Sequence, residues 1–379
     1  MEPGNKPLYA LIIDDIKRKI EEGMYTVHQQ IPTEMELAYQ FGVSRITSKR
    51  ALLELERGGY IYRKRGSGSY VKERAGDKEP FLGGTSSAPQ RIISMILPYM
   101  AANGHLDYMR GATEYLESKG YYLSIHCTDW NPEKEKELLT RLPKHGFSGI
   151  ILYPISSIHN MEVLNLQYID QYPIVTMDQY YDSIPVPSVC SDNFRGGYIA
   201  AQRLIELGHR RIAFVSSIGI EYRSSVRDRY FGYCQALKDG GLPSDAELVI
   251  TDFYRQVNEE NKEAFYTEMI QFLLGRKATA IQAEHDELAL DLLKVCLGSN
   301  IQVPEQLSLV GFDDEEVSRH FEVPLATVLQ NKYEIGRRAA EAVIDLLEER
   351  KLAVKRMLIP IMLQERQSIG PLAGERLML

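Results

Sequence analysis

The sequence predicts a small helical domain that ends in a β-hairpin, followed by an α/β body of two doubly wound lobes. Three observations predict this. Short amphipathic segments separated by Gly-containing turns occupy the first 60 residues. Residues 72–90 are rich in Gly, Pro, Ser and Thr and have no hydrophobic period, which indicates a linker. From Arg91 onward, apolar strand-like segments alternate with amphipathic helical ones, a pattern typical of parallel sheets covered on both faces. A chain of 379 residues accommodates two or three such units.

The first predicted helix covers residues 8–22, where apolar residues recur every four positions, and it ends before Gly23. A second helix is expected after Pro32-Thr33, because Thr33 and Glu36 have the spacing of a capping box. These two helices should pack on each other through their apolar faces.

A third helix is expected to begin after Ser44 and to end near Gly58-Gly59. Its apolar stripe consists of Ser48, Ala51, Leu52 and Leu55. Residues 60–71, YIYRKRGSGSYV, then form two short strands around Gly66-Ser67-Gly68. The order helix, Gly-containing turn, helix and hairpin predicts a winged helix-turn-helix (α+β) domain.

Charge is distributed unevenly along the chain. The whole chain has a net charge of −8, but residues 41–72 hold eight Lys or Arg and two Glu, a local charge of +6 that leaves −14 for the remainder. A basic segment on an acidic body is typical of a dedicated nucleic-acid-binding head. The alternative is a solvated basic helix face without a partner.

The body, residues 91–370, is expected to form two lobes with a boundary near residues 180–192 and a return crossing near 320–360. The predicted strands are IISMILP, YYLSIH, GIILYP, PIVTMD, RIAFVSS, ATAIQA and LSLVGFD. The predicted helices are 108–119, 132–142, 195–207, 227–239, 261–275, 286–297 and 333–350. In such folds, ligands bind outside the carboxyl ends of the strands.

Several classes of protein are disfavoured. No apolar run approaches the roughly 18 residues of a transmembrane helix, and the N-terminal residues lack a cleavage signal, so a cytoplasmic protein without a membrane partner is expected. The four cysteines have no metal-ligand spacing, and no metal or cofactor is expected. The sequence shows no nucleophile–base set, phosphate loop or dinucleotide turn, which argues against an enzyme.

The head resembles the winged-helix domain of the GntR family of bacterial repressors. The resemblance lies in PLYALIIDDIKRKIEEG, IPTEMELAYQFGVSR and ALLELERGGYIYRKRGSGSYV, in that order. It implies that the third helix enters the major groove of DNA and that the wing reaches the minor groove. The DNA-contacting residues that the resemblance implies are Glu34, Ser44, Arg45, Thr47, Lys49, Arg65, Gly66, Ser67 and Gly68.

The body resembles the LacI/GalR effector domain, which is itself periplasmic-binding-protein-like. The matching segments include GFSGIILYP, PIVTMD, DNFRGGYIAAQRLIELGHRRIAFVSS and VPEQLSLVGFDDEEVSRHFEVPLATV. A GntR-type head joined to a LacI-type body is similar to the arabinose-operon repressors of Bacillus relatives. The resemblance implies a sugar site between the lobes.

That resemblance assigns the effector contacts to Asp178, Arg229 and Asp313, and His285 stands where the family usually has Asn. His105 and Trp130 follow the first two strands of the body. They are also predicted to contact the effector, because ligands approach the carboxyl ends of these strands. Each has a structural alternative: Asp313 as the cap of a turn, Arg229 paired with Asp228 or a buried acid, and the others as structural or packing residues.

The function expected from these features is a sequence-specific transcriptional repressor of carbohydrate-utilisation genes. A small sugar, L-arabinose or a related one, would release it from operator DNA. A homodimer is expected by resemblance, through helices near 108–118 and 286–297. A sugar-transport protein is the second hypothesis, because its lobes would look much the same, and an enzyme is the third.

Overall fold

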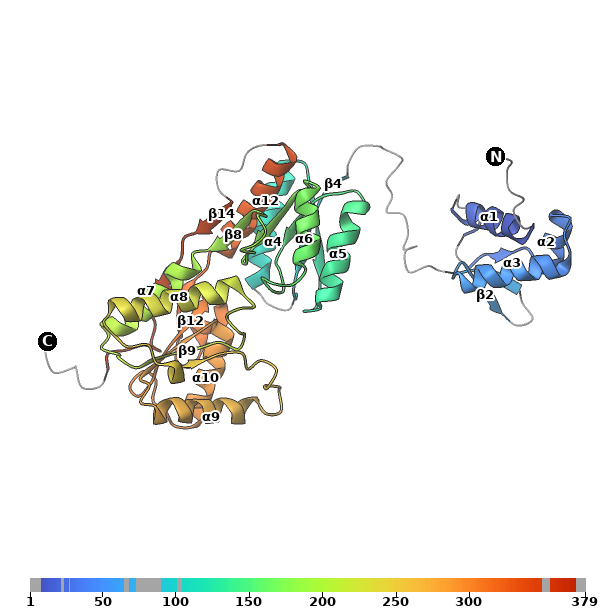
Figure 1. Cartoon of the computed structure of the whole chain (residues 1–379). Helices are drawn as coiled ribbons and strands as arrows, with labels where there is room; N and C mark the ends of the chain where they lie inside the picture. Colours follow the sequence, from blue (N-terminus) through green and yellow to red (C-terminus); the bar gives the residue numbers. More distant parts are fainter. Residues whose placement is uncertain are drawn as a thin grey trace. The chain divides into compact units, whose positions relative to one another are not determined.

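The computed structural model describes residues 8–21, 24–26, 28–64, 68–72, 90–100, 104–349 and 355–372. The chain divides into two compact units, Met1–Ser87 and Ala88–Leu379. Figure 1 shows both units and labels the more prominent of their helices and strands. The predicted linker residues 73–89 lie outside the described residues.

The first unit is a three-helix domain with a small antiparallel sheet. Its elements are α1 Leu8–Glu21, β1 Gln30–Ile31, α2 Glu34–Gln40, α3 Arg45–Arg57, β2 Ile61–Lys64 and β3 Gly68–Val71. The sheet order is β1-β3-β2. The predicted helices and hairpin are confirmed, and the capping box forms as expected, because Thr33 accepts from the N–H of Glu36 while its own N–H donates to the Glu36 carboxylate. The short strand β1 was not predicted.

The predicted apolar stripe of α3 forms part of the core of this unit. The buried residues of α3 are Ser48, Ala51, Leu52 and Leu55, as the helical period requires. The apolar core consists of Ile12, Ile16, Ile31, Leu37, Ala51, Leu52, Leu55, Ile61 and Val71. This packing fixes which face of α3 remains exposed.

The second unit contains two six-stranded sheets, one in each lobe. The N-terminal lobe has the strand order β14-β8-β7-β6-β4-β5, and all neighbouring strands are parallel. Its strands are β4 Gln90–Leu97, β5 Tyr122–Cys127, β6 Phe147–Leu152, β7 Ile174–Met177, β8 Ser188–Ser191 and β14 Arg356–Ile359. Helices α4 Gly104–Ser118 and α12 Lys332–Leu347 pack on one face, and α5 Pro132–Lys144 and α6 Met161–Ile169 on the other.

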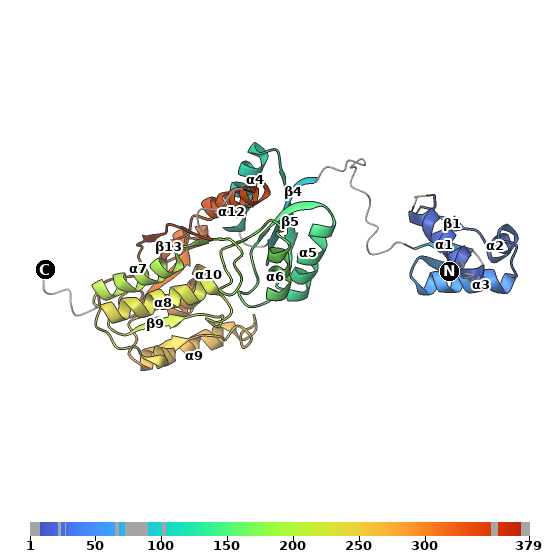
Figure 2. The same cartoon turned by 45° about the horizontal axis from the view of Figure 1, so that its top comes forward.

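The C-terminal lobe has the strand order β10-β9-β11-β12-β13-β15. Its strands are β9 Ile212–Val215, β10 Val249–Ile250, β11 Ala280–Ala283, β12 Ser308–Asp313, β13 Ala326–Leu329 and β15 Met362–Gln364. Helices α7 Asn193–Glu206 and α8 Ser224–Asp239 cover one face, and α9 Lys262–Gly275 and α10 Asp286–Gly298 cover the other (Figure 2). Two short helices, η1 Ala246–Leu248 and α11 Glu316–His320, lie in the connections. Strand β15 runs antiparallel to β13, which departs from the predicted all-parallel arrangement.

The chain crosses between the lobes three times. The crossings lie between β8 and α7, between β13 and α12, and between β14 and β15. Three crossings allow one lobe to rotate relative to the other while both sheets stay intact. The predicted fold class is confirmed, and none of the described helices is long and apolar enough to cross a membrane.

Candidate functional site

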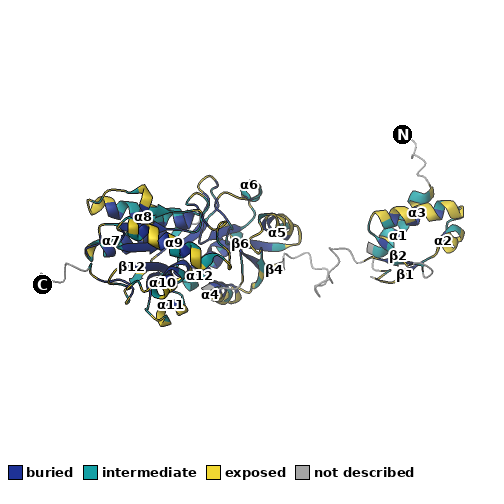
Figure 3. Cartoon of the chain, turned by 90° about the horizontal axis from the view of Figure 1, so that it is seen from below, coloured by how far each residue is buried: buried dark blue, intermediate teal, exposed yellow. Residues whose placement is uncertain are grey.

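The first candidate site is the exposed face of α3. Arg45, Ile46, Lys49 and Arg50 are exposed on this helix, and exposed stretches of α3 appear in yellow in Figure 3. Arg50 lies over the ring of Tyr9, with its guanidinium carbon 4.2 Å from the ring centroid. Arg45 and Lys49 therefore present positive charge at the amino-terminal half of the helix, where a recognition helix meets the major groove.

Glu34 holds Arg45 in position from the start of α2. Its Oε2 accepts from Arg45 Nε at 3.2 Å, and its Oε1 lies 3.6 Å from Arg63 Nη1. The backbone oxygen of Glu34 also accepts from the Ser48 hydroxyl at 2.7 Å, which ties α2 to α3. Because a guanidinium has five N–H donors, Arg45 keeps free donors while Glu34 orients it.

The other predicted DNA-contacting residues differ in how they are placed. Ser44 caps α3 through the N–H of Thr47 at 3.2 Å, and their hydroxyls lie 2.9 Å apart. Gly68 has a φ of 123° and begins β3 at the wing. Arg65, Gly66 and Ser67 lie outside the described residues, so their predicted contacts stay predictions.

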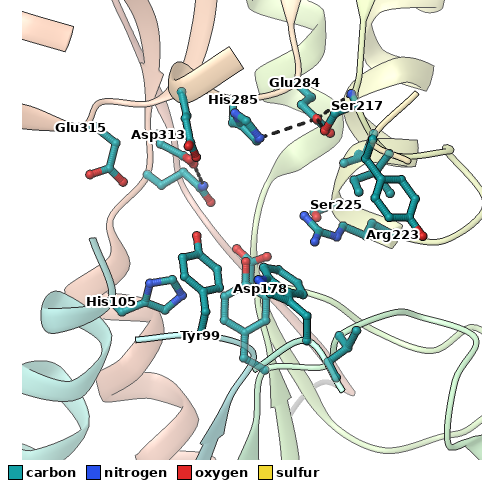
Figure 4. Close-up of a pocket in the computed structure, with 18 of the residues that line it drawn as sticks. Tyr99, His105, Asp178, Ser217, Arg223, Ser225, Glu284, His285, Asp313 and Glu315 are labelled. Atoms are coloured by element: carbon teal, nitrogen blue, oxygen red, sulfur yellow. Dashed lines mark hydrogen bonds and ion pairs between the residues drawn. The ribbon is translucent and has the colours of Figure 1, made fainter. Parts of the chain in front are cut away.

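The second candidate site is a cavity of about 1290 Å³ between the lobes of the body. All six predicted effector residues line it: His105, Trp130, Asp178, Arg229, His285 and Asp313. In Figure 4, Asp178 and His105 of the N-terminal lobe face Asp313 and His285 of the C-terminal lobe across the cavity. The structure thus brings together residues that are up to 208 positions apart (105 to 313) in the sequence.

Asp178 follows β7 directly and is 3% exposed. Its Oδ1 accepts from the Tyr108 hydroxyl at 3.1 Å, and its N–H donates to the Val189 oxygen at 2.9 Å. Its φ of 65° turns the chain sharply at the end of the strand. These contacts hold the carboxylate at the cavity wall.

Arg229 projects from α8 and is 5% exposed. Its Nε donates to the Asn193 side-chain oxygen at 2.8 Å, its Nη1 donates to the backbone oxygen of Glu284, and the group stacks on the Phe312 ring at 3.5 Å. The alternative of an ion pair with Asp228 is wrong, because Asp228 accepts from the Tyr180 hydroxyl at 2.9 Å. Both of its hydrogen-bond acceptors are neutral, and its positive charge lowers the pKa of Asp313.

Asp313 ends β12, where its φ is 121°. Its carboxylate accepts a hydrogen bond from the side-chain nitrogen of Gln330 and does not cap the following turn. Burial raises the pKa of Asp313, but the positive charges of Lys332 and Arg229 outweigh burial and hold it below its usual value. An ionised carboxylate at this position can accept hydroxyl hydrogen bonds from a ligand.

His285 is both the N-cap of α10 and part of the cavity wall. Its Nδ1 accepts from the N–H of Leu288 at 3.0 Å, and its Nε2 lies 3.6 Å from Glu284 Oε1. Glu284 is fully buried and accepts from the Ser216 hydroxyl at 2.7 Å and the Ser217 N–H at 2.7 Å. Burial raises the pKa of Glu284, but His285 and these donors lower it below its usual value overall.

An aromatic wall closes the N-terminal side of the cavity. Trp130 stacks on Tyr99 with ring centroids 4.9 Å apart, and His105 meets Tyr99 edge-on at 4.5 Å. Arg223, from the C-terminal lobe, lies 4.8 Å over the Trp130 ring. Trp130 and His105 thus both line the cavity, and their predicted contacts with a ligand stay predictions.

Sequence reasoning missed several residues of the cavity wall: Tyr99, Ser217, Arg223, Glu284, Gln330 and Lys332. The rule that ligands meet the carboxyl ends of strands also points to Tyr99, Ser217 and Glu284, which lie just after β4, β9 and β11. No local pattern marks Gln330 and Lys332, which lie in the crossing from β13 to α12.

Comparisons with known proteins cover both units. Residues 8–71 match the gntR family of bacterial regulatory proteins, and residues 201–369 match a periplasmic binding protein-like domain. The chain is 32% identical over 349 residues to the arabinose metabolism transcriptional repressor of Halalkalibacterium halodurans, which covers 90% of each chain.

Two solved structures share the fold. A LacI family transcriptional regulator from Enterococcus faecium with bound ribose has a TM-score of 0.62 and 24% identity, covering 74% of this chain and 99% of that one. The transcriptional regulator CelR in complex with cellobiose has a TM-score of 0.64 and 22% identity, covering 89% of this chain and 100% of that one. At these identities the structures show the fold alone.

The repressor from Halalkalibacterium halodurans is similar over almost the whole chain, including both the head and the body. The chain therefore belongs to the family of transcriptional repressors that join a gntR-type helix-turn-helix head to a periplasmic-binding-protein-like effector domain.

Proposed function

We propose that this chain represses carbohydrate-utilisation genes and that a small sugar, bound between its lobes, releases it from operator DNA. The observation that supports this most strongly is the cavity wall, where Asp178 from one lobe faces Asp313 from the other (Figure 4). Arg229 of the C-terminal lobe lines the same cavity. Carboxylates and guanidinium groups bind sugar hydroxyls, and the Tyr99–Trp130 stack offers an apolar face to a sugar ring.

The ligand is best matched by a neutral sugar. The positive charges of Arg229 and Lys332 lie close enough to Asp313 to lower its pKa, so the negative charge of this carboxylate is balanced within the wall. The volume of about 1290 Å³ exceeds the usual 300–1,000 Å³ of small-ligand sites, which leaves room for a monosaccharide or a short oligosaccharide. L-Arabinose is the first candidate because the relative named above regulates arabinose metabolism.

A sugar can release the operator only if it binds one arrangement of the lobes better than the other. A ligand held by residues of both lobes favours a closed cleft and so rotates one lobe about the three crossings. We expect a coupling of about 1–3 kcal/mol, or roughly 5- to 150-fold in operator affinity. By reciprocity, operator DNA weakens sugar binding by the same factor.

We also propose a homodimer, formed through helices near residues 108–118 and 286–297. Two heads reading a near-palindrome give more specificity than one head that reads a few base pairs. Sedimentation of the full chain with and without operator tests this; a monomer that binds one half-site as tightly as the full operator contradicts it. The division into a head of residues 1–71, a linker of 72–90 and a body of 91–370 is tested by whether residues 91–370, produced alone, bind sugar.

A gel-shift assay with and without a sugar panel tests the whole proposal. The panel includes L-arabinose, D-ribose, D-xylose, D-glucose and cellobiose, and the DNA is a duplex enriched from a random library by binding to the protein. We expect specific binding that one sugar abolishes. Sugar binding without DNA binding would instead indicate a transport protein, and consumption of the sugar would indicate an enzyme.

A further inference from the structure

The exposed face of α3 carries an apolar side chain among its cations. Ile46 is 81% exposed at the second position of the helix, whereas Leu55 of the same helix is fully buried. Nine positions separate them, about two and a half turns at 3.6 residues per turn, so the two side chains lie on opposite faces of the helix. Ile46 therefore points directly away from the core of its own unit.

The neighbours of Ile46 are the side chains that would bring DNA to it. Arg45 precedes it, and Lys49 and Arg50 lie three and four positions later, the spacings that place side chains next to each other on a helix. Arg45 is held by Glu34 at 3.2 Å. An isolated exposed isoleucine is common on protein surfaces, but this one lies within the positively charged, amino-terminal half of a recognition helix.

The chemistry of Ile46 limits what it can read. Its side chain has no hydrogen-bonding atom, and phosphates and most base edges offer hydrogen-bonding groups. In the major groove, the C5-methyl group of thymine is the apolar group that a base pair presents. An isoleucine placed over a donor or acceptor of another base would remove water from that group without replacing its hydrogen bond.

We propose that Ile46 contacts the methyl group of a thymine in each half-site and so selects a T·A pair at one operator position. Arg45 and Lys49 hold the flanking base and backbone while Ile46 excludes water from the methyl group. This inference rests on the DNA-binding role of the head and adds the identity of one base that it reads.

The test replaces single thymines by uracil in the enriched duplex, which removes the methyl group and keeps the base pair. Wild-type protein should lose roughly three- to tenfold in affinity at one thymine per half-site, the effect of losing one buried methyl group. Ile46→Ala should bind the thymine duplex more weakly by a similar factor and should not distinguish uracil from thymine at that position. Ile46→Val should keep the discrimination.

Leu53→Ala is the matched control. Leu53 is 37% exposed on the same helix, seven positions and about two turns after Ile46, so it lies on the same side but away from the amino-terminal end. This variant should keep the full penalty for uracil. Thermal unfolding of each variant checks that the head remains folded.

Equal uracil penalties for wild type and Ile46→Ala at every thymine would overturn the inference, as would a wild type indifferent to all single replacements. Both outcomes leave specific DNA binding in place, so they count against the base assignment alone. If wild-type protein enriches no duplex at all, then the DNA-binding role itself fails.

Discussion

Ser191 donates a hydrogen bond of 2.6 Å to the side-chain oxygen of Gln330, and the side-chain nitrogen of Gln330 donates to Asp313. Ser191 ends β8 and Gln330 follows β13, so both stand at crossings between the lobes. Gln330 is 6% exposed and its amide has one fixed orientation, since each end meets a different partner. The carboxylate of Asp313 in the cavity wall thus accepts a hydrogen bond from Gln330, which lies in the segment that connects the lobes between β13 and α12.

Replacing Gln330 by Ala should weaken sugar binding, because Asp313 loses the donor that orients it. A hydrogen bond to a charged group is worth about 1.5–3 kcal/mol, which corresponds to roughly 10- to 150-fold in affinity. Calorimetry with the sugar found by gel shift measures this loss, while operator affinity without sugar should not change. Gln330→Glu should be at least as harmful, since it places a second carboxylate beside Asp313; tight sugar binding by that variant would contradict the role of the amide.

Asp313→Ala should bind operator DNA like wild type but should not release it when sugar is added. The reason is that the variant keeps the head intact and removes a hydrogen-bond acceptor from the C-terminal wall of the cavity. Gel shifts over a range of sugar concentrations measure the response, and Asp313→Asn, which keeps the shape without the charge, should respond only at higher concentration. Release of Asp313→Ala at ordinary sugar concentrations means that the ligand lies elsewhere.

Arg45→Ala and Lys49→Ala should differ in the kind of binding that they lose. Arg45 is oriented by Glu34, so its loss should cost about 1–3 kcal/mol on the operator and relax the preference at one base pair. Lys49 has no such fixed partner among the described residues and should hold phosphate. Its loss should weaken binding to all DNA sequences alike and should reduce the slope of log affinity against log salt concentration by about one unit. Equal losses on operator and random DNA for Arg45→Ala would show that Arg45 too contacts only phosphate.

Asp286 should make the stability of the body depend on pH. It is fully buried at the start of α10, its carboxylate accepts from the N–H of Glu315 at 2.9 Å, and burial, together with the nearby charge of Asp313, raises its pKa to about 7. The folded state therefore binds a proton on Asp286 more tightly than the unfolded state does. The contribution of Asp286 to the free energy of unfolding is complete below pH ~4 and is lost as the pH rises to about 7.

The free energy of unfolding should fall by about 1.4 kcal/mol per pH unit between pH ~4 and about 7 because of Asp286. Denaturant unfolding of wild type and Asp286→Asn at several pH values measures it as a difference, which removes the contributions of other groups. Relative to wild type, Asp286→Asn should become progressively more stable between pH ~4 and about 7. A difference that stays constant with pH would show that Asp286 has the same pKa in the folded and unfolded chain.

Local sequence determined the head and the outline of the body. The helical period alone selected the buried face of α3, and the Thr33–Glu36 spacing placed the start of α2, because both depend on residues within a few positions of each other. The alternation of strands and helices predicted the two lobes. The rule for the ends of parallel strands, with the family resemblance, then named six residues that line one cavity.

Tertiary structure alone decided how those residues are held and what joins them. Strands β8 and β13 are four residues long and buried, with serine or threonine among the apolar residues, so no clear period marks them in the sequence. The link from Ser191 through Gln330 to Asp313 joins positions that are 139 and 17 residues apart. Contacts of this kind depend on which strands become neighbours in a sheet and where the chain crosses between lobes, and the packing of the whole body determines both.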